Sequence, residues 1–390
     1  MAEWSDLPRE LLVLIAKRLD NHFDLLRFRS VCSSWRCSVS PRAPSLPSRF
    51  PIIQNDGTTE TSGGFYLSKR TICRLGLPEP RRRVPSDDWL IKVEENVPQS
   101  ICLLNPLSSL KSKCLSSTFP RTLDLSNIRI SELGREYVLQ YVNSRPFADA
   151  LGDVNNLYME KVVFASNPDG TFAVLTIHIS GKLAVFKSGD ENWSVIEDFP
   201  SPYDDVALFD GRFYAVDGNG RAVVVEMEPS PSVNLIAGAM FGGDKKCLVE
   251  SNGELLLVDV YLRMGLAEED SDVDEGDGSS EELPRILSER MGRFKVYRLS
   301  RSEQKWVEVR SLGDRILFLG DNCAFSASAS DFYGRKGNCI YFTDLGDIEV
   351  FDLDEGRRID DSRGCSELFW PPPAWITAMS LDVGLDQVMI

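Results

Sequence analysis

One strand-and-turn phrase recurs three times in this chain of 390 residues and limits the folds available to it. In each copy a turn residue precedes an apolar run that ends at an aspartate: residues 211–217 (GRFYAVD), 253–259 (GELLLVD) and 338–344 (NCIYFTD). The first two copies start 42 residues apart, and the third starts 85 residues later, about twice that interval. A strand repeat of about 40–50 residues is typical of β-propeller blades, which stack around an axis because one blade cannot bury both faces alone. A β-sandwich or barrel is the alternative, but neither requires a recurring phrase.

Runs of β-branched and aromatic residues between turn signals predict strands over most of the chain beyond residue 160. Trp193 and Trp306 each follow a polar turn and resemble the tryptophan of kelch-type blades. No strand is predicted between residues 116 and 156, which leaves the number of blades open. The predicted strands are 162–164, 172–179, 182–186, 206–209, 212–216, 222–227, 246–250, 254–260, 294–299, 306–309, 339–343 and 348–353.

The first forty residues have a different, helical pattern. Apolar residues recur at helical spacing between residues 11 and 19, and they continue at three- and four-residue steps from Leu25 to Trp35. Three prolines within residues 41–47 then end the helical structure. The sequence therefore predicts two or three short helices. A segment this short cannot bury its own apolar surface, so we expect it to dock onto another protein.

The charge distribution argues against a general nucleic-acid binder. The formal net charge is −16, but nine of the acids lie between residues 268 and 282, where no Lys or Arg occurs. Nucleic-acid binding requires a net basic face, which this total does not supply. A local basic patch (Lys69, Arg70, Arg74 and residues 81–83) has no aromatic platform among its arginines, and we expect a solvated face or loop there.

The inventory of reactive residues is poor in catalytic and metal-binding groups. The two histidines, His22 and His178, fall in a predicted helix turn and along a predicted strand, and neither is expected to serve as a catalytic base. The nine cysteines include no CxxC pair, which makes zinc improbable and is typical of buried thiols in a reducing compartment. We predict no catalytic residue, no metal and no cofactor.

Glycine and carboxylate motifs have simple structural explanations. Residues 218–220 (GNG) lack the third glycine of a dinucleotide fingerprint and predict a hairpin turn. The adjacent acids Asp204-Asp205 and Asp360-Asp361 cannot share one face of a strand, so we interpret them as loop acids.

The acidic run contains a near match to a calcium-binding loop. Acids at 270, 272, 274 and 281 have the spacing of such a loop, but Glu275 stands where a glycine is required. We expect instead a disordered insertion over residues 267–283. Serines 271, 279 and 280 within it are candidates for phosphorylation by an acid-directed kinase.

The N-terminus predicts an intracellular location. It has no signal-peptide pattern, and its longest apolar stretch, residues 11–16, is too short for a membrane span. We expect the protein in the nucleus, the cytoplasm or both.

Residues 7–36 resemble an F-box: they contain Leu7-Pro8, the apolar stripe of the first helix, residues 28–32 (FRSVC) and Trp35-Arg36 in the order of that motif. In this family the helices pack against the Skp-type adaptor of a cullin–RING ubiquitin ligase. The resemblance implies that the apolar residues form an interface and not a core of their own. The predicted adaptor-binding residues are Leu7, Pro8, Leu11, Leu12, Ile15, Leu19, Leu25, Phe28, Val31, Cys32 and Trp35.

The rest of the chain resembles the plant KIB-type β-propeller domain, which commonly follows an F-box. The matching phrases include 88–90 (DWL), 101–108 (ICLLNPLS), 203–206 (YDDV) and 369–376 (FWPPPAWI). Within this family the chain is similar to the group described as SKP1-interacting partner 23-like. The expected fold is a small all-α F-box followed by an all-β propeller with kelch-like blades. The expected domains are an F-box at 3–42, a Pro/Ser-rich linker at 43–60 and a propeller at 61–390.

The resemblance implies a non-catalytic, substrate-recognition subunit of an SCF (Skp–cullin–F-box) ubiquitin ligase. Its F-box would bind the Skp-type adaptor and, through it, the cullin–RING ligase, while the propeller would bind an unknown protein substrate. No nucleic acid and no membrane is expected as a partner. Two alternatives stay open: an F-box scaffold that delivers no substrate for degradation, and a carbohydrate-binding or hydrolytic propeller.

Overall fold

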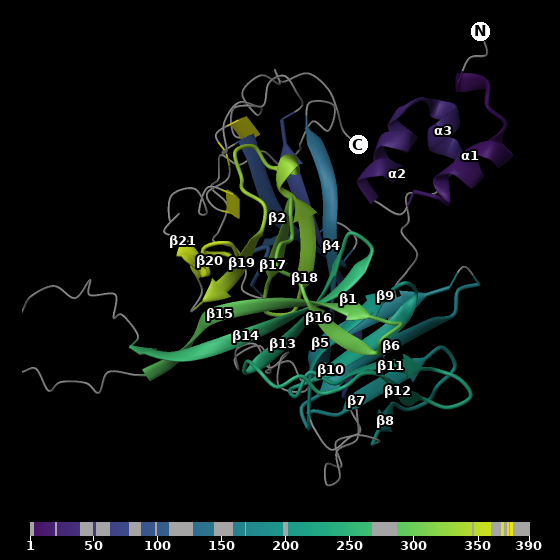
Figure 1. Ribbon diagram of the computed structural model, residues 1–390. Coiled ribbons are helices and arrows are strands. Elements are labelled where there is room, and N and C mark those ends of the chain that lie inside the picture. The colour runs from purple at the N-terminus through teal and green to yellow at the C-terminus, as the bar shows by residue number, and fades with distance from the viewer. Residues whose placement is uncertain are drawn as a thin grey trace, which may run out of the picture. The chain divides into compact units, whose positions relative to one another are not determined.

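The computed structural model divides into two compact units, one made of Met1–Pro106, Leu110–Asn155 and Ser366–Ile390, the other of Leu107–Ser109 and Asn156–Cys365. Three short helices are followed by strands in the described part of the chain, which confirms the predicted fold class. Figure 1 shows how these elements are arranged. The structure describes residues 4–19, 22–39, 50–51, 63–77, 87–97, 100–108, 128–143, 159–167, 169–197, 202–266, 287–344, 347–359, 368–369, 373 and 375–376.

The first unit begins with a 3-10 turn η1 (Trp4–Asp6) and the helices α1 (Arg9–Ala16), α2 (His22–Ser30) and α3 (Ser33–Ser38). Helix α1 starts directly after Pro8, whose carbonyl oxygen accepts hydrogen bonds from the N–H groups of Leu11 and Leu12 at 3.0 and 3.1 Å. A proline suits this place because the first amides of a helix have no partner within it. The prediction of two or three short helices is confirmed.

Four strands follow in the first unit, in the order β3-β2-β1-β4, and each pairs antiparallel with its neighbour. Phe50, inside the predicted linker, forms an isolated β-bridge to Phe65 on β1. The other linker residues, apart from Pro51, lie outside the described residues, and the predicted domain limits stay predictions. The strands are β1 (Gly63–Gly76), β2 (Asp88–Val97), β3 (Ser100–Leu104) and β4 (Arg129–Asn143).

One face of this sheet holds buried charges. Arg70 Nε lies 2.9 Å from Glu94 Oε1 and its Nη1 lies 3.1 Å from Glu136 Oε1, while Lys92 Nζ lies 2.6 Å from Glu136 Oε2. The predicted solvated basic patch is therefore wrong at Arg70 and Arg74, whose exposed fractions are 9% and 5%. Each arginine lies on β1 beside a carboxylate, and a buried charge of this kind needs a partner. Residues 81–83 of the patch lie outside the described residues.

The second unit consists of four successive groups of paired strands, and all twelve predicted strands coincide with strands there. The first three groups are β5 (Met159–Ser166), β6 (Phe172–His178), β7 (Leu183–Lys187) and β8 (Ser194–Ile196); β9 (Tyr203–Phe209), β10 (Arg212–Asp217), β11 (Ala222–Glu226) and β12 (Ser232–Ala237); and β13 (Lys245–Ser251), β14 (Glu254–Leu266), β15 (Leu287–Ser300) and β16 (Lys305–Glu308). In each group the strands pair antiparallel in sequence order.

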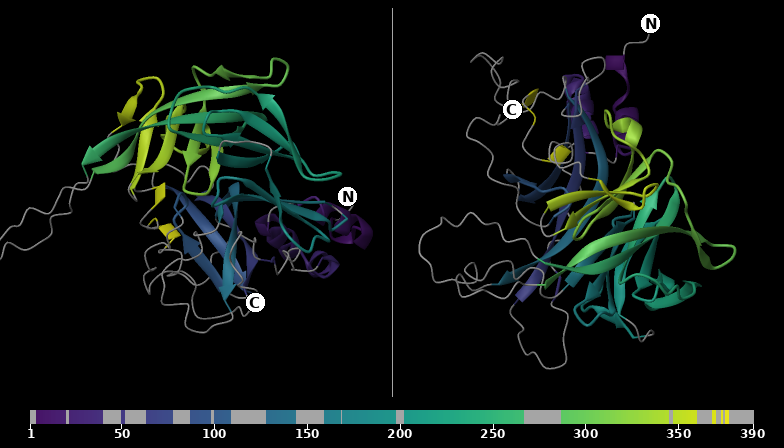
Figure 2. Two further views of the ribbon diagram at one scale, coloured as in Figure 1. Left: turned by 90° about the horizontal axis from the view of Figure 1, so that it is seen from below. Right: turned by 60° about the vertical axis from the view of Figure 1, so that its left-hand side comes forward.

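The fourth group departs from this simple order. Its strands lie in the order β18-β17-β19-β20-β21, and β17 pairs parallel with β19. Figure 2 shows this group and the long β14–β15 hairpin in two further views. The acidic insertion at 267–283, with its calcium-loop acids and serines, lies between β14 and β15 but outside the described residues, as does Asp360-Asp361. The elements are β17 (Arg315–Leu319), β18 (Ala324–Ser328), η5 (Ala329–Asp331), β19 (Cys339–Asp344), β20 (Asp347–Asp352) and β21 (Arg357–Ile359).

The recurrent phrase lies in the strands β10, β14 and β19, and its aspartate is buried in each copy: it ends β10 and β19 and lies within the longer β14. Each aspartate is paired with a cation of the second unit, which offsets the cost of burying the carboxylate. The sequence repeat thus corresponds to a repeated structural unit. The three pairs are Asp217–Arg221 at 2.6 Å, Asp259–Lys246 at 2.7 Å and Asp344–Arg358 at 2.8 Å.

Neighbouring strand groups of the second unit pack against one another through shared apolar clusters, as blades do. One cluster joins Leu175 of β6 to Phe213 of β10, and another joins Val224 of β11 to Leu257 of β14. Trp306 on β16 adds a polar tie, because its Nε1 donates to the carbonyl of Gly220 at 2.8 Å. Trp193, the other tryptophan of the predicted register, precedes β8 and packs on Phe186 with ring centroids 5.4 Å apart.

Asp204-Asp205 are not the loop acids predicted from the sequence. Both lie on β9, and both accept hydrogen bonds from backbone amides of β13. Asp204 Oδ2 accepts from Lys246 N–H at 2.9 Å, and Asp205 Oδ2 accepts from Leu248 N–H at 2.7 Å. The two carboxylates therefore join adjacent strand groups. Residues 218–220, in contrast, form the predicted turn between β10 and β11.

Candidate functional site

The three N-terminal helices enclose a small apolar core of their own. Leu12, Ala16 and Phe28 have exposed fractions of 0%, 7% and 5%. Leu7, Leu19, Leu25, Trp35 and Val39 are partly buried against them. The expectation that these apolar residues form no private core is therefore wrong for Leu12 and Phe28, whose burial holds the helices together. As adaptor contacts, all eleven predicted residues stay predictions.

Trp35 links the helices by two contacts. Its ring centroid lies 4.5 Å from that of Phe28 on α2, and its Nε1 donates a hydrogen bond to the Trp4 carbonyl at 3.1 Å. An aromatic pair in a tilted geometry adds to the burial of its apolar area. Trp35 thus fixes how α2, α3 and η1 lie relative to one another.

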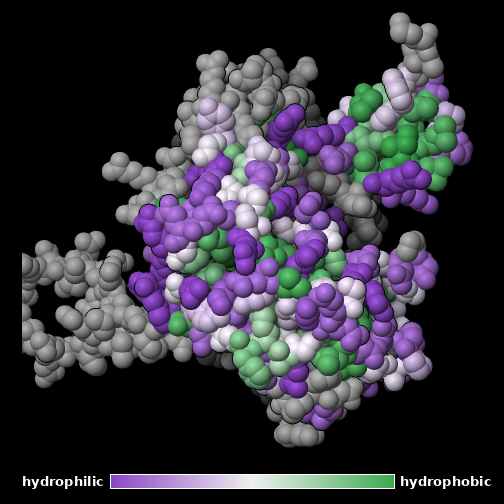
Figure 3. All heavy atoms as spheres, viewed as in Figure 1, coloured by the Kyte–Doolittle hydropathy of each residue, from purple (hydrophilic) through white to green (hydrophobic). Residues whose placement is uncertain are grey.

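A second, outward set of apolar residues covers α1. Leu11, Leu14 and Ile15 are 47%, 57% and 38% exposed, and their spacing of three and four residues places them on one face of the helix. We call these three residues the α1 surface. Figure 3 shows hydrophobic residues gathered on these helices. Exposed apolar patches of this kind mark interaction sites.

The remaining predicted adaptor residues lie at the ends of the helices. Pro8 is exposed before α1, Val31 is 57% exposed after α2, and Cys32 is half-buried. Sequence reasoning missed two exposed candidates, Leu14 and the 73% exposed Trp4. The spacing of Leu14 from Leu11 was a usable signal, whereas nothing in the sequence indicates that Trp4 is exposed.

The histidines do not assemble a catalytic centre in the described part of the chain. His178 ends β6 as a buried blade residue, with Nδ1 2.8 Å from Ser180 Oγ, and burial lowers its pKa. No carboxylate among the described residues hydrogen-bonds to its ring, so this pair lacks the third member of a triad there. His22 begins α2. Across the described residues no cluster of His, Cys, Asp and Glu has the arrangement of a metal site.

No helix within the described ranges is long and apolar enough to cross a membrane.

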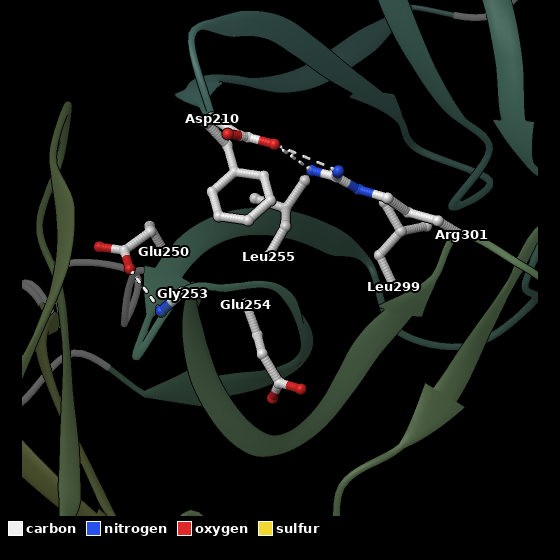
Figure 4. Close-up of a pocket in the computed structure, with 8 residues that line it drawn as sticks. Asp210, Glu250, Gly253, Glu254, Leu255, Leu299 and Arg301 are labelled. Carbon is white, nitrogen blue, oxygen red and sulfur yellow. Dashed lines mark hydrogen bonds and ion pairs between the residues drawn. The ribbon is translucent and has the colours of Figure 1, made fainter.

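A cleft of about 610 Å³ lies in the second unit, where turns of two neighbouring sheets converge (Figure 4). The β9–β10 and β13–β14 turns form two of its walls, and the end of β15 forms the third. We call it the rim cleft. Its lining residues are Phe209, Asp210, Glu250, Gly253, Glu254, Leu255, Leu299 and Arg301.

Backbone conformation defines two of these walls as tight turns. Asp210 and Gly211 have φ of 51° and 70°, and Asn252 and Gly253 have φ of 53° and 75°. Two successive residues with positive φ are the signature of tight two-residue hairpin turns, and Asp-Gly and Asn-Gly are the pairs that favour them. The turn residues of the sequence repeat therefore position the cleft.

Charged side chains line the cleft in an ordered way. Arg301 Nη1 lies 3.2 Å from Asp210 Oδ2, its guanidinium carbon lies 5.2 Å from the Phe209 ring centroid, and its Nη2 lies 3.3 Å from the Tyr214 hydroxyl. Glu254 pairs with Arg298 at 3.0 Å. Glu250 Oε1 accepts a hydrogen bond from Gly253 N–H at 2.9 Å. The Asp210–Arg301 and Glu250–Gly253 contacts are visible in Figure 4.

Comparison with known proteins assigns both parts of the chain to described families. A family model described as F-box-like matches residues 4–42, and one described as KIB1-4 beta-propeller matches residues 64–352. F-box protein SKIP23 of Arabidopsis thaliana is 45% identical over 406 residues, covering 97% of this chain and 96% of that protein. F-box protein At2g17036 of the same plant is 36% identical, covering 97% and 95%. These matches confirm the predicted family resemblance.

A solved structure of a Synechocystis apocarotenoid oxygenase aligns with 76% of this chain and 80% of its own chain, at 11% sequence identity and a TM-score of 0.27. A TM-score this low supports no argument about fold or function.

Proposed function

Because the chain belongs to the F-box proteins that carry a KIB1-4 β-propeller, we propose that it is the substrate-recognition subunit of an SCF ubiquitin ligase. The family supports an F-box substrate-adaptor role, and its members are in general non-catalytic. In this proposal the F-box helices bind a Skp-type adaptor, and the propeller binds the protein to be ubiquitinated, which we call the client.

The α1 surface is the observation that carries the proposal. Three large apolar side chains on a helix of eight residues stay exposed, although Leu12 and Ala16 of the same helix are buried in the helical core. Nothing in the private core requires Leu11, Leu14 and Ile15 to be apolar. An adaptor that covers them would remove this apolar area from water, and such burial dominates the affinity of interface centres.

The proposed contribution of the chain to catalysis is positional. A protein that holds an adaptor at one site and a client at another raises the effective concentration of the client near the ubiquitin-loaded enzyme, without making or breaking a bond itself. The tight turns of the second unit are suited to the client side of this task, because a short turn between paired strands has little conformational freedom to lose on binding. We place this activity in the nucleus, the cytoplasm or both.

Affinity purification of the full-length chain from plant cells, with the proteasome and cullin neddylation inhibited, tests the proposal. The wild type is compared with Leu11→Asp/Ile15→Asp, which places charges on the α1 surface, and with Ile179→Asp. Ile179 is 57% exposed in the turn after β6, so it offers a similar exposed apolar residue outside the F-box.

We expect adaptor and cullin to co-purify with the wild type and with Ile179→Asp but not with the double variant. Clients should be enriched by all three proteins, and in parallel cultures without the inhibitors they should accumulate in cells that express the double variant. Enrichment of partners whose abundance is the same in all three lines would instead favour a scaffold that delivers no substrate. Failure of the wild type to recover adaptor would contradict the proposal itself.

A further inference from the structure

The rim cleft combines three properties of a recognition site. Its floor is apolar, because Phe209, Leu255 and Leu299 line it and pack onto the core shared by β10, β11 and β14. Its walls are polar, and two of them are tight turns with defined backbone conformation. A ligand in this cleft would therefore contact both apolar and charged side chains, and the charged ones would fix its orientation.

The charged residues of the cleft determine which kind of ligand it favours. Three carboxylates and one guanidinium line it, so its net charge is negative. Arg301 is already engaged by Asp210, the Phe209 ring and the Tyr214 hydroxyl, which makes it part of the wall and not an anion receptor. Glu254 is likewise paired with Arg298.

Glu250 differs from the other two carboxylates. Its Oε1 atom accepts from the Gly253 amide, and in the described ranges no Lys or Arg lies within ion-pairing distance of it. The amide fixes one carboxylate oxygen of Glu250 at the β13–β14 turn, at the edge of the cleft (Figure 4). A cation brought there by a ligand would gain an interaction with Glu250 that no described Lys or Arg supplies.

We infer that the rim cleft binds an extended segment of the client in which a cationic side chain stands next to a leucine-sized apolar one. The apolar side chain covers the floor formed by Phe209, Leu255 and Leu299, and the cation pairs with Glu250. This inference rests on the proposed function, because that function implies a client. It adds the chemistry of the client segment that the propeller binds. An acidic or phosphorylated segment is excluded by the same charges.

The direct test measures binding of a short fluorescein-labelled peptide with a central Arg-Leu-Arg sequence, flanked by Gly and Ser, to the full-length chain by fluorescence anisotropy. Peptides with Glu-Leu-Glu and Arg-Gly-Arg centres separate the contributions of charge and apolar contact. The protein variants are Glu250→Gln, which keeps an oxygen for the Gly253 amide, and Glu250→Arg, which reverses the charge. Glu191→Gln is the matched control, because Glu191 is an exposed acid in the β7–β8 turn, outside the cleft.

We expect saturable binding of the Arg-Leu-Arg peptide that weakens about fivefold in Glu250→Gln and more than tenfold in Glu250→Arg, with Glu191→Gln unchanged. Binding should also weaken when NaCl rises from about 0.05 to 0.5 M, and the other two peptides should bind more weakly. Equal affinity for Arg-Leu-Arg and Arg-Gly-Arg, equal weakening by Glu191→Gln, or no saturable binding to the wild type would overturn the inference. Thermal unfolding of each variant, followed by circular dichroism, checks that the fold is retained.

This result is independent of the test of the proposed function. If adaptor and clients co-purify but the peptide does not bind, the chain is a substrate receptor that binds its client at a site other than the rim cleft. If the peptide binds but no adaptor is recovered, the cleft recognises peptides and the SCF assignment fails.

Discussion

The carboxylate of Asp205 on β9 accepts a hydrogen bond from the backbone N–H of Leu248 on β13 at 2.7 Å. Its other oxygen accepts from Val206 N–H at 2.7 Å and lies 2.6 Å from Lys161 Nζ on β5. A single buried side chain thus contacts three successive strand groups of the second unit. Because a buried amide without a partner raises the free energy of the folded state, we expect the hydrogen bonds of Asp205 to stabilise the packing of adjacent blades.

Replacement of Asp205 by alanine should lower the free energy of unfolding by about 3 kcal/mol. The substitution leaves two backbone amides without their hydrogen-bond acceptor and the Lys161 ammonium group without its carboxylate partner. Urea denaturation followed by circular dichroism measures the effect. Asp169→Ala is the control, because that carboxylate caps an exposed turn through Thr171, and its loss should cost less than about 1 kcal/mol. Equal stability of the two variants would contradict the role given to Asp205.

The two faces of α1 should respond differently to truncation. Leu12→Ala removes a completely buried side chain and should destabilise the helical core by about 2–4 kcal/mol, whereas Leu14→Ala should cost less than about 1 kcal/mol because Leu14 is 57% exposed. Amide hydrogen exchange over residues 9–38 reports on this small core separately from the strands. Faster exchange is expected in Leu12→Ala alone, and matching exchange in both variants would show that the burial pattern is wrong.

Trp306 ties the outer strand β16 to the β10–β11 turn through its indole N–H and the Gly220 carbonyl. Trp306→Phe keeps most of the ring but cannot donate this hydrogen bond, so it should lower the free energy of unfolding by about 1–2 kcal/mol. Trp4→Phe, at a 73% exposed position, is the control and should be neutral. A neutral Trp306→Phe would mean that the indole N–H finds an equivalent partner in water.

Cysteine reactivity offers a test by pH. Burial, reinforced by the nearby Asp352 carboxylate, raises the pKa of the Cys339 thiol to about 11. Only the thiolate is alkylated, so about 0.1% of this thiol is reactive at pH 8. Mass spectrometry of the native protein treated with iodoacetamide should find the exposed Cys37 modified before the buried Cys339. The rate at Cys339 should rise about tenfold per pH unit between pH 8 and 10, and fast, pH-independent labelling would contradict the pKa shift.

The sequence predicted twelve strands of the second unit, because these are apolar and separated by turn residues with a required conformation, and it left out β8, β12, β17, β18 and β21. It failed at β4, where Glu136 and Gln140 interrupt the apolar pattern of the strand. The structure supplies the reason: Glu136 is neutralised by Arg70 and Lys92, and Gln140 donates to Glu94 at 2.7 Å. Charged residues in the sequence of one strand predict a loop, because their partners lie on neighbouring strands and do not appear in that local pattern.

The candidate adaptor site was predicted at the level of the segment but not of individual side chains. Leu11 and Leu12 are adjacent leucines in one apolar stripe, yet one is 47% exposed and the other completely buried. Which of them faces inward depends on how Phe28 and Trp35 of the other helices pack, and single-helix periodicity does not contain this information. Leu14 was left out of the predicted set, although it lies one turn from Leu11.

The central claim is that the α1 surface binds a Skp-type adaptor, and the affinity of purified full-length protein for that adaptor tests it most directly. Biolayer interferometry should compare the wild type with Leu14→Asp and with Ile179→Asp, two substitutions at positions that are both 57% exposed. We predict that Leu14→Asp weakens binding tenfold or more, about 1.4 kcal/mol, while Ile179→Asp leaves it unchanged. Unchanged adaptor affinity in a correctly folded Leu14→Asp protein would contradict the claim.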